Sequence, residues 1–195
     1  LHRPTEGRVL VDGVPIEICV RSWRSLIGYV PQDVYLVDAS LRENIALGVQ
    51  VDSIDEDAVL RAIERVQLGD LVRSLDGGVD TEVGERGTRL SGGQRQRIGI
   101  ARALYGDPRL LILDEATSAL DSETEARIGE TIAELRTQMT VIAIAHRLTT
   151  LRDFERVLFL DDGALVGDGS FSELRDKHPR FARLLAQSNL DLTQR

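Results

Sequence analysis

Lysine is nearly absent from this 195-residue chain, since Lys177 is its only one. A loop that cradles phosphates ends in Gly-Lys-Ser or Gly-Lys-Thr, because the lysine reaches the outer phosphates of a nucleotide. Lys177 follows Asp176 instead of a glycine and lies near the C-terminus. The printed sequence therefore contains no such loop.

Cysteine is equally scarce, and long apolar runs are missing. The single Cys19 excludes a disulfide within the chain and a zinc site built on several cysteines. The longest apolar runs, Leu110–Leu113 and Val141–Ala145, have the length of strands and fall far short of the roughly 20 residues of a membrane helix. With 42% hydrophobic and 4% aromatic residues, the composition favours an α/β protein that buries a core around one sheet.

Two further absences concern charge and the start of the chain. The formal net charge is -8 and the arginines are scattered, whereas proteins that bind DNA or RNA usually carry a basic patch. We therefore expect no nucleic-acid partner. The chain begins at Leu1 and its sole methionine is Met139, so we expect it to be a piece of a longer polypeptide.

The residues that are present predict strands and helices in a definite order. Apolar residues recur at helical spacing from residue 33 to about 105, which predicts a helix-rich insert. Residues 106 to 195 alternate between strand and helix patterns, which is typical of a parallel sheet with crossover helices. The stretch Arg8–Gly13 predicts a short strand closed by an Asp-Gly turn, and further strands are predicted at Ile27–Val30, Leu110–Leu113 and Val141–Ala145, the last two buried. A helix beginning near Ser122, a hairpin of Val157–Leu160 with Ala164–Val166 and a helical tail complete the set.

Four polar residues follow the predicted strands: Gln32, Asp114, Glu115 and His146. Ligands of open α/β sheets bind beyond the carboxyl ends of the strands. Asp114 suits Mg²⁺, because a hard cation prefers oxygen ligands, and Gln32 could complete the metal shell. Glu115 could polarise an attacking water as a general base, and His146 could hold a terminal phosphate.

The segment Ser91-Gly92-Gly93-Gln94 opens a predicted helix. Ser91 is a good N-cap, and the backbone N–H groups of the three residues after it form an anion site at the helix N-terminus. Each feature also has an ordinary structural interpretation. Paired carboxylates often begin a solvated loop, a lone histidine at a strand end is often structural, and Ser-Gly-Gly can be a plain turn. The joint order and spacing of these segments favours a functional site.

In that order the motifs resemble those of the nucleotide-binding domain of ABC transporters, and the resemblance covers almost all of the chain. Val30–Gln32 is similar to the Q-loop, Leu90–Gln94 to the signature motif and Leu110–Glu115 to the Walker B strand with its catalytic glutamate. Ser118–Asp121 resembles the D-loop, and His146 resembles the switch histidine. The family's phosphate loop would lie upstream of Leu1.

The resemblance implies an α/β fold with the parallel-sheet core of a P-loop NTPase (RecA-like), lacking its P-loop and carrying an inserted helical subdomain. The whole chain, 1–195, would be a partial ABC-type nucleotide-binding domain. Residues 1–32 and 106–195 would form the RecA-like core, and residues 33–105 would form the helical subdomain with the signature motif.

The branch of the family is also indicated. Thr81–Gly87, Ser40–Ala46 and Ile144–Leu148 resemble exporter segments. The resemblance then implies a transmembrane domain in the same polypeptide, and a location at the cytoplasmic face of the membrane as part of an integral membrane transporter. Ser22–Arg24, Val34–Asp38 and Gly169–Leu174 look like segments of flippases for lipid-linked oligosaccharides.

The resemblance also implies ATP and Mg²⁺ as cofactors and a second nucleotide-binding domain as partner, in a head-to-tail dimer. The signature residues Ser91, Gly92, Gly93 and Gln94 would contact ATP held by the partner. Asp114 and Gln32 would hold Mg²⁺, Glu115, His146 and Gln32 would serve hydrolysis, and Asp121 would lie at the dimer seam. The residues after Gln32 and the loop 81–87 would meet the membrane domain. Because the phosphate loop is missing, we expect the isolated chain to be inactive.

Two other interpretations use the same motifs. A soluble ABC ATPase that acts in DNA repair or on ribosomes has no membrane domain, and the exporter-like loop 81–87 and the acidic balance disfavour it. A non-catalytic domain would only donate its signature motif to a partner. Intact Asp114, Glu115 and His146 argue against that alternative.

Overall fold

The computed structural model describes residues 4–84, 87–116, 122–145 and 148–193. It divides into two units, Leu1–Ile144 and Ala145–Arg195, which are described separately. Within these described ranges, no helix combines the length and the apolar character needed to cross a membrane.

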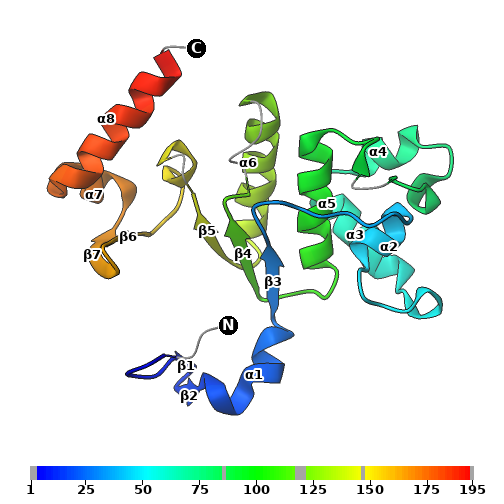
Figure 1. The fold of residues 1–195 in the computed structure, drawn as a ribbon, viewed down its shortest axis with the longest axis horizontal. Coiled ribbons are helices and arrows are strands. Elements are labelled where there is room, and N and C mark those ends of the chain that lie inside the picture. The colour runs from blue at the N-terminus through cyan, green and yellow to red at the C-terminus, as the bar shows by residue number, and fades with distance from the viewer. Residues whose placement is uncertain (1–3, 85–86, 117–121, 146–147, 194–195) are drawn as a thin grey trace. The chain divides into compact units, whose positions relative to one another are not determined.

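A three-stranded parallel sheet forms the centre of the first unit (Figure 1). Its order is β3 (Ile27–Val30), β4 (Leu110–Asp114) and β5 (Thr140–Ile144). Tyr29 pairs with Ile112, and Ile112 pairs with Ile142. The three strands and their parallel arrangement confirm the prediction from the apolar runs, with shifts of one residue at most.

Helix α5 (Gly92–Leu104) packs against β3, and α6 (Ser122–Arg136) packs against β5. The approach of α5 is close, because a Cβ on Gly28 would lie 2.5 Å from the carbonyl oxygen of Ala103. A Cβ on Gly99 would likewise lie 2.4 Å from Val34 Cγ2. Glycine is therefore required on both the strand and the helix at this contact.

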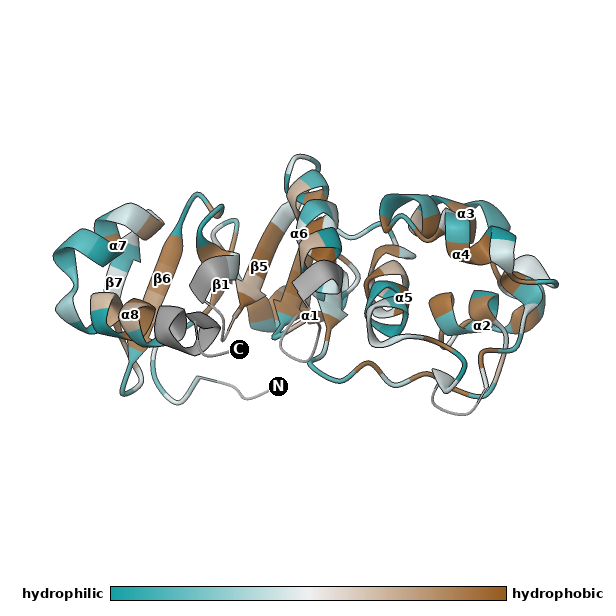
Figure 2. Ribbon diagram, turned by 90° about the horizontal axis from the view of Figure 1, so that it is seen from above, coloured by the Kyte–Doolittle hydropathy of each residue, from teal (hydrophilic) through white to brown (hydrophobic). Residues whose placement is uncertain are grey.

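The opposite face of the sheet is more open than expected. Ile142 is 49% exposed and Ile144 52% exposed, although the apolar run predicted a buried strand here. The prediction was right for the other face, where Leu111 and Leu113 are buried. No described helix of this unit packs over the exposed side chains, which is the physical reason for the difference. Figure 2 shows how apolar β5 is beside the mixed polar and apolar surface of α6.

The helix-rich stretch follows β3, as predicted. It contains α2 (Leu41–Ile45), α3 (Glu56–Arg65) and α4 (Gly69–Ser74), with short 3-10 turns at Val51–Ser53 and Gly78–Asp80. In Figure 1 helix α5 lies between these helices and the sheet, and contacts of α5 with α2, α3 and β3 agree. Its core consists of fully buried side chains from several elements: Leu36, Leu41, Val59, Leu68 and Ile98.

The N-terminal part holds a hairpin and a helix that the sequence did not predict. Strands β1 (Leu10–Val11) and β2 (Val14–Pro15) pair antiparallel around an Asp-Gly turn, as the pattern indicated for the first strand. Helix α1 (Ile16–Arg24) follows directly. It was missed although Ile16, Val20 and Trp23 recur at helical spacing; the helix is short, no residue in it is buried, and its backbone geometry breaks at Cys19.

The second unit is a hairpin followed by two helices. Strands β6 (Val157–Asp161) and β7 (Ala164–Gly169) pair antiparallel, which confirms the predicted hairpin. Helices α7 (Phe171–Lys177) and α8 (Pro179–Thr193) follow, and a short 3-10 turn at Leu148–Leu151 precedes the hairpin. Three aromatic rings meet edge to face in its core, with Phe159 and Phe171 centred 5.4 and 5.6 Å from Phe181.

Candidate functional site

The carboxyl ends of the parallel strands bring three of the predicted site residues to one edge of the sheet. Val30 pairs with Leu113, and Asp114 pairs with Ile144, so Gln32, Asp114 and Glu115 all follow the same edge. Gln32 is exposed and Asp114 is half-buried. His146 and Asp121, which were predicted to join this site, lie outside the described residues.

Glu115 has an unusual backbone conformation. Its φ is +52°, in the left-handed region that residues other than glycine rarely adopt. Its N–H donates to the carbonyl of Ile144 at 2.9 Å, which continues the bonding between β4 and β5 past the last residue of β4. Strained backbone of this kind is concentrated at functional sites. The strain therefore singles out Glu115 among the residues at this edge.

Asp114 has a partner that the sequence analysis missed. The hydroxyl of Tyr29 donates to Asp114 Oδ2 at 2.9 Å, and this bond to a carboxylate raises the pKa of Tyr29 above its ordinary value. Tyr29 pairs with Ile112, two residues before Asp114, so both side chains belong to the same face of the sheet. A predicted register between the strands 27–30 and 110–113 would have indicated that Tyr29 and Asp114 can meet.

The signature segment forms the start of α5, and the predicted N-cap is confirmed. Ser91 Oγ accepts from Gln94 N at 3.2 Å, while Gln94 Oε1 accepts from Ser91 N at 2.8 Å. Arg95 Nη1 also donates to the carbonyl of Leu90 at 2.7 Å and fixes the approach to the helix. The hydroxyl of Ser91 and the N–H groups of Gly92 and Gly93 are then available at the helix N-terminus as donors for an anion.

Gly93 is required by the packing around this turn. A Cβ at Gly93 would lie 2.0 Å from Cγ2 of Thr124 in α6, a distance that no side chain tolerates. The first turn of α5 is therefore seated directly on α6, the helix that follows the strand of Asp114. Packing thus links the anion-binding turn to the carboxylate edge.

The donor set at the strand ends fits Mg²⁺ bound together with a phosphate. Such an ion usually takes only one or two carboxylates from the protein, and waters and phosphate oxygens complete its shell. Asp114 and the side-chain amide of Gln32 supply oxygens of this kind. Over the described ranges no group of three His, Cys, Asp or Glu side chains gathers, as a closed all-protein metal cage would require.

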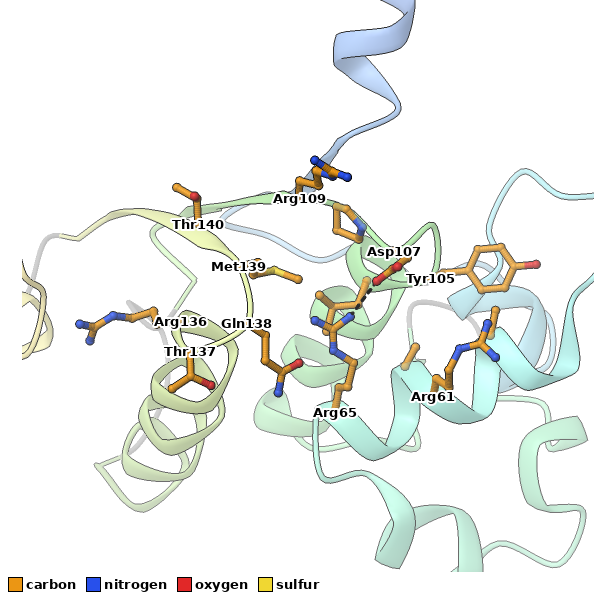
Figure 3. A pocket seen from close by; sticks show the side chains of 14 residues that line it. Arg61, Arg65, Tyr105, Asp107, Arg109, Arg136, Thr137, Gln138, Met139 and Thr140 are labelled. Carbon is orange, nitrogen blue, oxygen red and sulfur yellow. Dashed lines mark ion pairs between the residues drawn. The ribbon is translucent and has the colours of Figure 1, made fainter. Parts of the chain in front are cut away.

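A large cavity lies away from this chemistry, at the amino ends of β4 and β5 (Figure 3). It has a volume of about 910 Å³ and is rich in arginine. Arg65 and Arg136 belong to the last turns of α3 and α6, where cations balance the negative end of the helix dipole. Arg65 also pairs with Asp107 at 3.5 Å, while Arg136 points away on the opposite side in Figure 3. Arg65 and Arg136 thus belong to helix ends, and these two side chains do not converge on a ligand.

Parallel strands with oxygen ligands at their carboxyl ends, beside a capped helix start, define an α/β domain suited to nucleotide phosphates. The structure is similar to that of a bacterial Atm1-family ABC exporter with ATP bound, with a TM-score of 0.84 and 40% identity over 96% of this chain and 33% of that chain. The fold is therefore that of the P-loop NTPases, although the printed sequence contains no phosphate loop.

The sequence profile of the ABC transporter family matches residues 1–118, so the chain belongs to the ABC transporter family. It is 47% identical over 191 residues to the β-(1→2)glucan export ATP-binding/permease protein NdvA of Agrobacterium vitis, which covers 97% of this chain and 32% of the relative. A multidrug resistance ABC transporter ATP-binding and permease protein of Lactococcus lactis is 39% identical over 187 residues, 95% of this chain and 32% of the relative. The chain thus spans about a third of the length of these curated relatives.

Proposed function

We propose that this chain is the C-terminal part of the ATP-binding and ATP-hydrolysing domain of an ABC exporter. The observation that carries the proposal is the shared strand edge of Gln32, Asp114 and the strained Glu115. The names of the relatives support export: one relative is named as a glucan exporter and the other as a multidrug resistance transporter. Neither name mentions a lipid-linked oligosaccharide, so the flippase-like sub-branch stays a prediction.

Each residue at the edge has a proposed task in hydrolysis. Asp114 and Gln32 provide oxygen ligands for Mg²⁺, which when bound neutralises charge on the phosphates of ATP. Glu115 accepts a proton from the attacking water as general base. His146, which lies outside the described residues, is proposed to hold the terminal phosphate.

The signature turn is proposed to act on ATP held by a second nucleotide-binding domain. Ser91 Oγ and the N–H groups of Gly92 and Gly93 donate to the terminal phosphate, while Gln94 keeps the cap in place. In a head-to-tail dimer the two such contacts are equivalent by symmetry. Asp121 lies at the seam between the two domains.

A membrane domain is the second proposed partner, and the helical subdomain 33–105 is proposed to receive it. Two of its segments form one surface: Leu41 N donates to Thr81 O at 3.0 Å, and Val83 N donates to Ala39 O at 3.1 Å. A cavity of about 450 Å³ lies beside them, lined by Asp38, Ala39, Ser40, Arg42, Glu43, Asp80 and Glu82. This surface joins the residues after Gln32 to the start of the loop 81–87. The proposed site of action is the cytoplasmic face of the membrane.

Replacement of the proposed base tests the role in hydrolysis. In the full-length polypeptide that contains this chain, Glu115→Gln should leave ATP binding intact and lower turnover by at least about a hundredfold, because an amide cannot accept the proton. Turnover is measured as phosphate release and binding with a fluorescent ATP analogue. Glu125→Gln is the matched control, since Glu125 lies outside the proposed site in α6. Unchanged turnover of Glu115→Gln would remove Glu115 from this role.

The isolated 195-residue chain offers a second test. Because it holds no Gly-Lys-Ser/Thr loop, it should bind Mg-ATP weakly or not at all in a calorimetric titration. Submicromolar binding would contradict this expectation.

A further inference from the structure

Tyr29 is placed where it can act on the proposed site although no role has been given to it above. Its side chain is 54% exposed on the open face of the sheet, yet its hydroxyl bonds to Asp114 Oδ2 at 2.9 Å. About half of Tyr29 stays in contact with water, so burial of the ring does not require its hydroxyl to meet a carboxylate. The contact therefore calls for an explanation other than core packing.

The register of the sheet explains how the two side chains meet. Tyr29 lies directly opposite Ile112, and Asp114 lies two residues further along the same strand. With strands about 4.8 Å apart and a rise of about 3.3 Å per residue, these two positions lie about 8 Å apart at Cα, which is within the reach of an aromatic ring but not of a short polar side chain. Tyrosine at position 29 thus supplies a donor at the distance that the sheet geometry sets.

The bond also limits what the carboxylate of Asp114 can do. The carboxylate of an aspartate can rotate about its Cβ–Cγ bond and exchange its two oxygens. A hydrogen bond to Oδ2 favours one orientation and leaves Oδ1 free to accept from another group or to bind a metal. Side chains that hold a metal ligand in this manner commonly change metal affinity or activity by about 10–100-fold when they are removed. The effect depends on the hydroxyl, because phenylalanine would keep the ring but not the bond.

We propose that Tyr29 is a positioning residue for Asp114, which holds the carboxylate in the orientation that binds Mg²⁺ of Mg-ATP. This inference rests on the proposed function. A purely structural role would instead predict that removal of the hydroxyl changes stability and leaves metal binding unchanged.

Metal binding in the full-length polypeptide separates the two roles. Mn²⁺ is titrated by electron paramagnetic resonance in the presence of ATP, in a Glu115→Gln background so that no turnover occurs. Tyr29→Phe should weaken Mn²⁺ binding about tenfold. Tyr105→Phe is the matched control, because its hydroxyl also holds one hydrogen bond, from Asp55 N at 3.0 Å, at the amino end of the strands. It should leave the Mn²⁺ affinity unchanged.

A double-mutant cycle shows whether Tyr29 acts through Asp114. If it does, Tyr29→Phe should have no further effect on Mn²⁺ affinity in an Asp114→Asn background. Equal Mn²⁺ affinity of Tyr29→Phe and the parent, or a full tenfold loss in the Asp114→Asn background, would overturn the positioning role alone. Failure of the parent itself to bind Mn²⁺ with ATP would instead overturn the proposed function. Thermal unfolding of the 195-residue chain verifies that Tyr29→Phe folds.

Discussion

The helical segment and the sheet bury their apolar side chains to different degrees. In the segment from Leu36 to Leu104 a group of apolar side chains, which includes Leu36, Leu41 and Ile98, is completely buried among helices, although Leu47 and Leu60 at its surface are about half exposed. In the sheet one face is packed by α5 and α6, while Tyr29, Ile142 and Ile144 on the other face are about half exposed. The signature turn therefore belongs to a part with a complete core of its own. The carboxylate edge belongs to a part that buries only one side.

The helical segment also contains a buried network of polar contacts. Asn44 is fully buried in the helical segment, where its amide nitrogen donates to the carbonyls of Val37 and Ser40, both at 3.0 Å. Arg102 of α5 donates to Asn44 O at 2.8 Å and to Tyr35 O at 2.9 Å, and burial lowers the pKa of this guanidinium. These bonds connect the residues after Gln32 to α5, the helix that begins with the signature turn. A displacement of the segment after Gln32 should therefore also displace α5, and the reverse.

The largest effect is expected where this buried network is broken. Asn44→Ala should lower the free energy of unfolding of the chain by about 4 kcal/mol, because it leaves several buried backbone groups without partners. Urea denaturation followed by circular dichroism measures the change. Gln138→Ala, at an exposed position, serves as control and should stay within about 0.5 kcal/mol. A loss below about 1 kcal/mol for Asn44→Ala would contradict the proposed contribution of these hydrogen bonds to the free energy of unfolding.

Substitutions on the two faces of the sheet should lower the free energy of unfolding by different amounts, and both losses should be smaller than that of Asn44→Ala. Leu111→Ala on the packed face should cost about 3 kcal/mol, since Leu111 is fully buried. Ile142→Ala on the open face should cost about 1 kcal/mol, because half of that side chain already contacts water. Both are measured by urea denaturation of the 195-residue chain. Equal losses would mean that the open face is covered in solution.

The contact between α5 and α6 can be tested with a pair of glycines. Gly93→Ala should destabilise the chain by about 2 kcal/mol through its clash with Thr124. Gly129→Ala in α6 meets no atom within 4 Å and should stabilise the chain by about 0.5 kcal/mol through helix propensity. Thermal unfolding compares the two. Thr124→Ser removes the methyl group that a Cβ at position 93 would meet, so adding it to Gly93→Ala should restore part of the lost stability. If it restores none, the clash with Thr124 is not the cause of the loss.

The smallest effect concerns acid stability in the helical segment. Hydrogen bonds from Ser40 hold the pKa of Glu43 below its ordinary value of 4.5. The carboxylate therefore stabilises the folded chain above the pKa that it has when unfolded, and this contribution is lost as the pH falls through the lower folded value. Glu43→Gln should flatten that part of the stability profile below about pH 4.5, as measured by thermal unfolding at a series of pH values. An unaltered profile would contradict the linkage.

The sequence predicted those features that depend on local pattern. Strands β3, β4 and β5 were placed within a residue, because continuous apolar runs between charged residues and prolines mark buried strands clearly. The start of α5 was recognised from Ser91 and its following glycines, since capping is a local interaction.

Contacts that depend on the exact register between distant segments were not predicted. The bond of Tyr29 to Asp114 spans 85 positions and exists only because of the register of β3 and β4. The strain at Glu115 and the exposure of Ile142 likewise follow from tertiary structure and from the cover that a face receives. The roles of His146 and Asp121 stay predictions, because both lie outside the described residues.

Among the helix starts whose caps the structure describes, three have a reciprocal cap between a serine and the residue three positions later: Glu43 in α2, Glu173 in α7 and Gln94 in α5. The two glutamates carry a full negative charge at neutral pH, whereas the glutamine carries none. A carboxylate at the start of α5 would repel a phosphate and cancel the positive end of the helix dipole. The amide keeps the same two hydrogen bonds without that repulsion, and it does not titrate. The helix that is proposed to face a nucleotide is thus capped by a group that adds no negative charge to its N-terminus at any physiological pH.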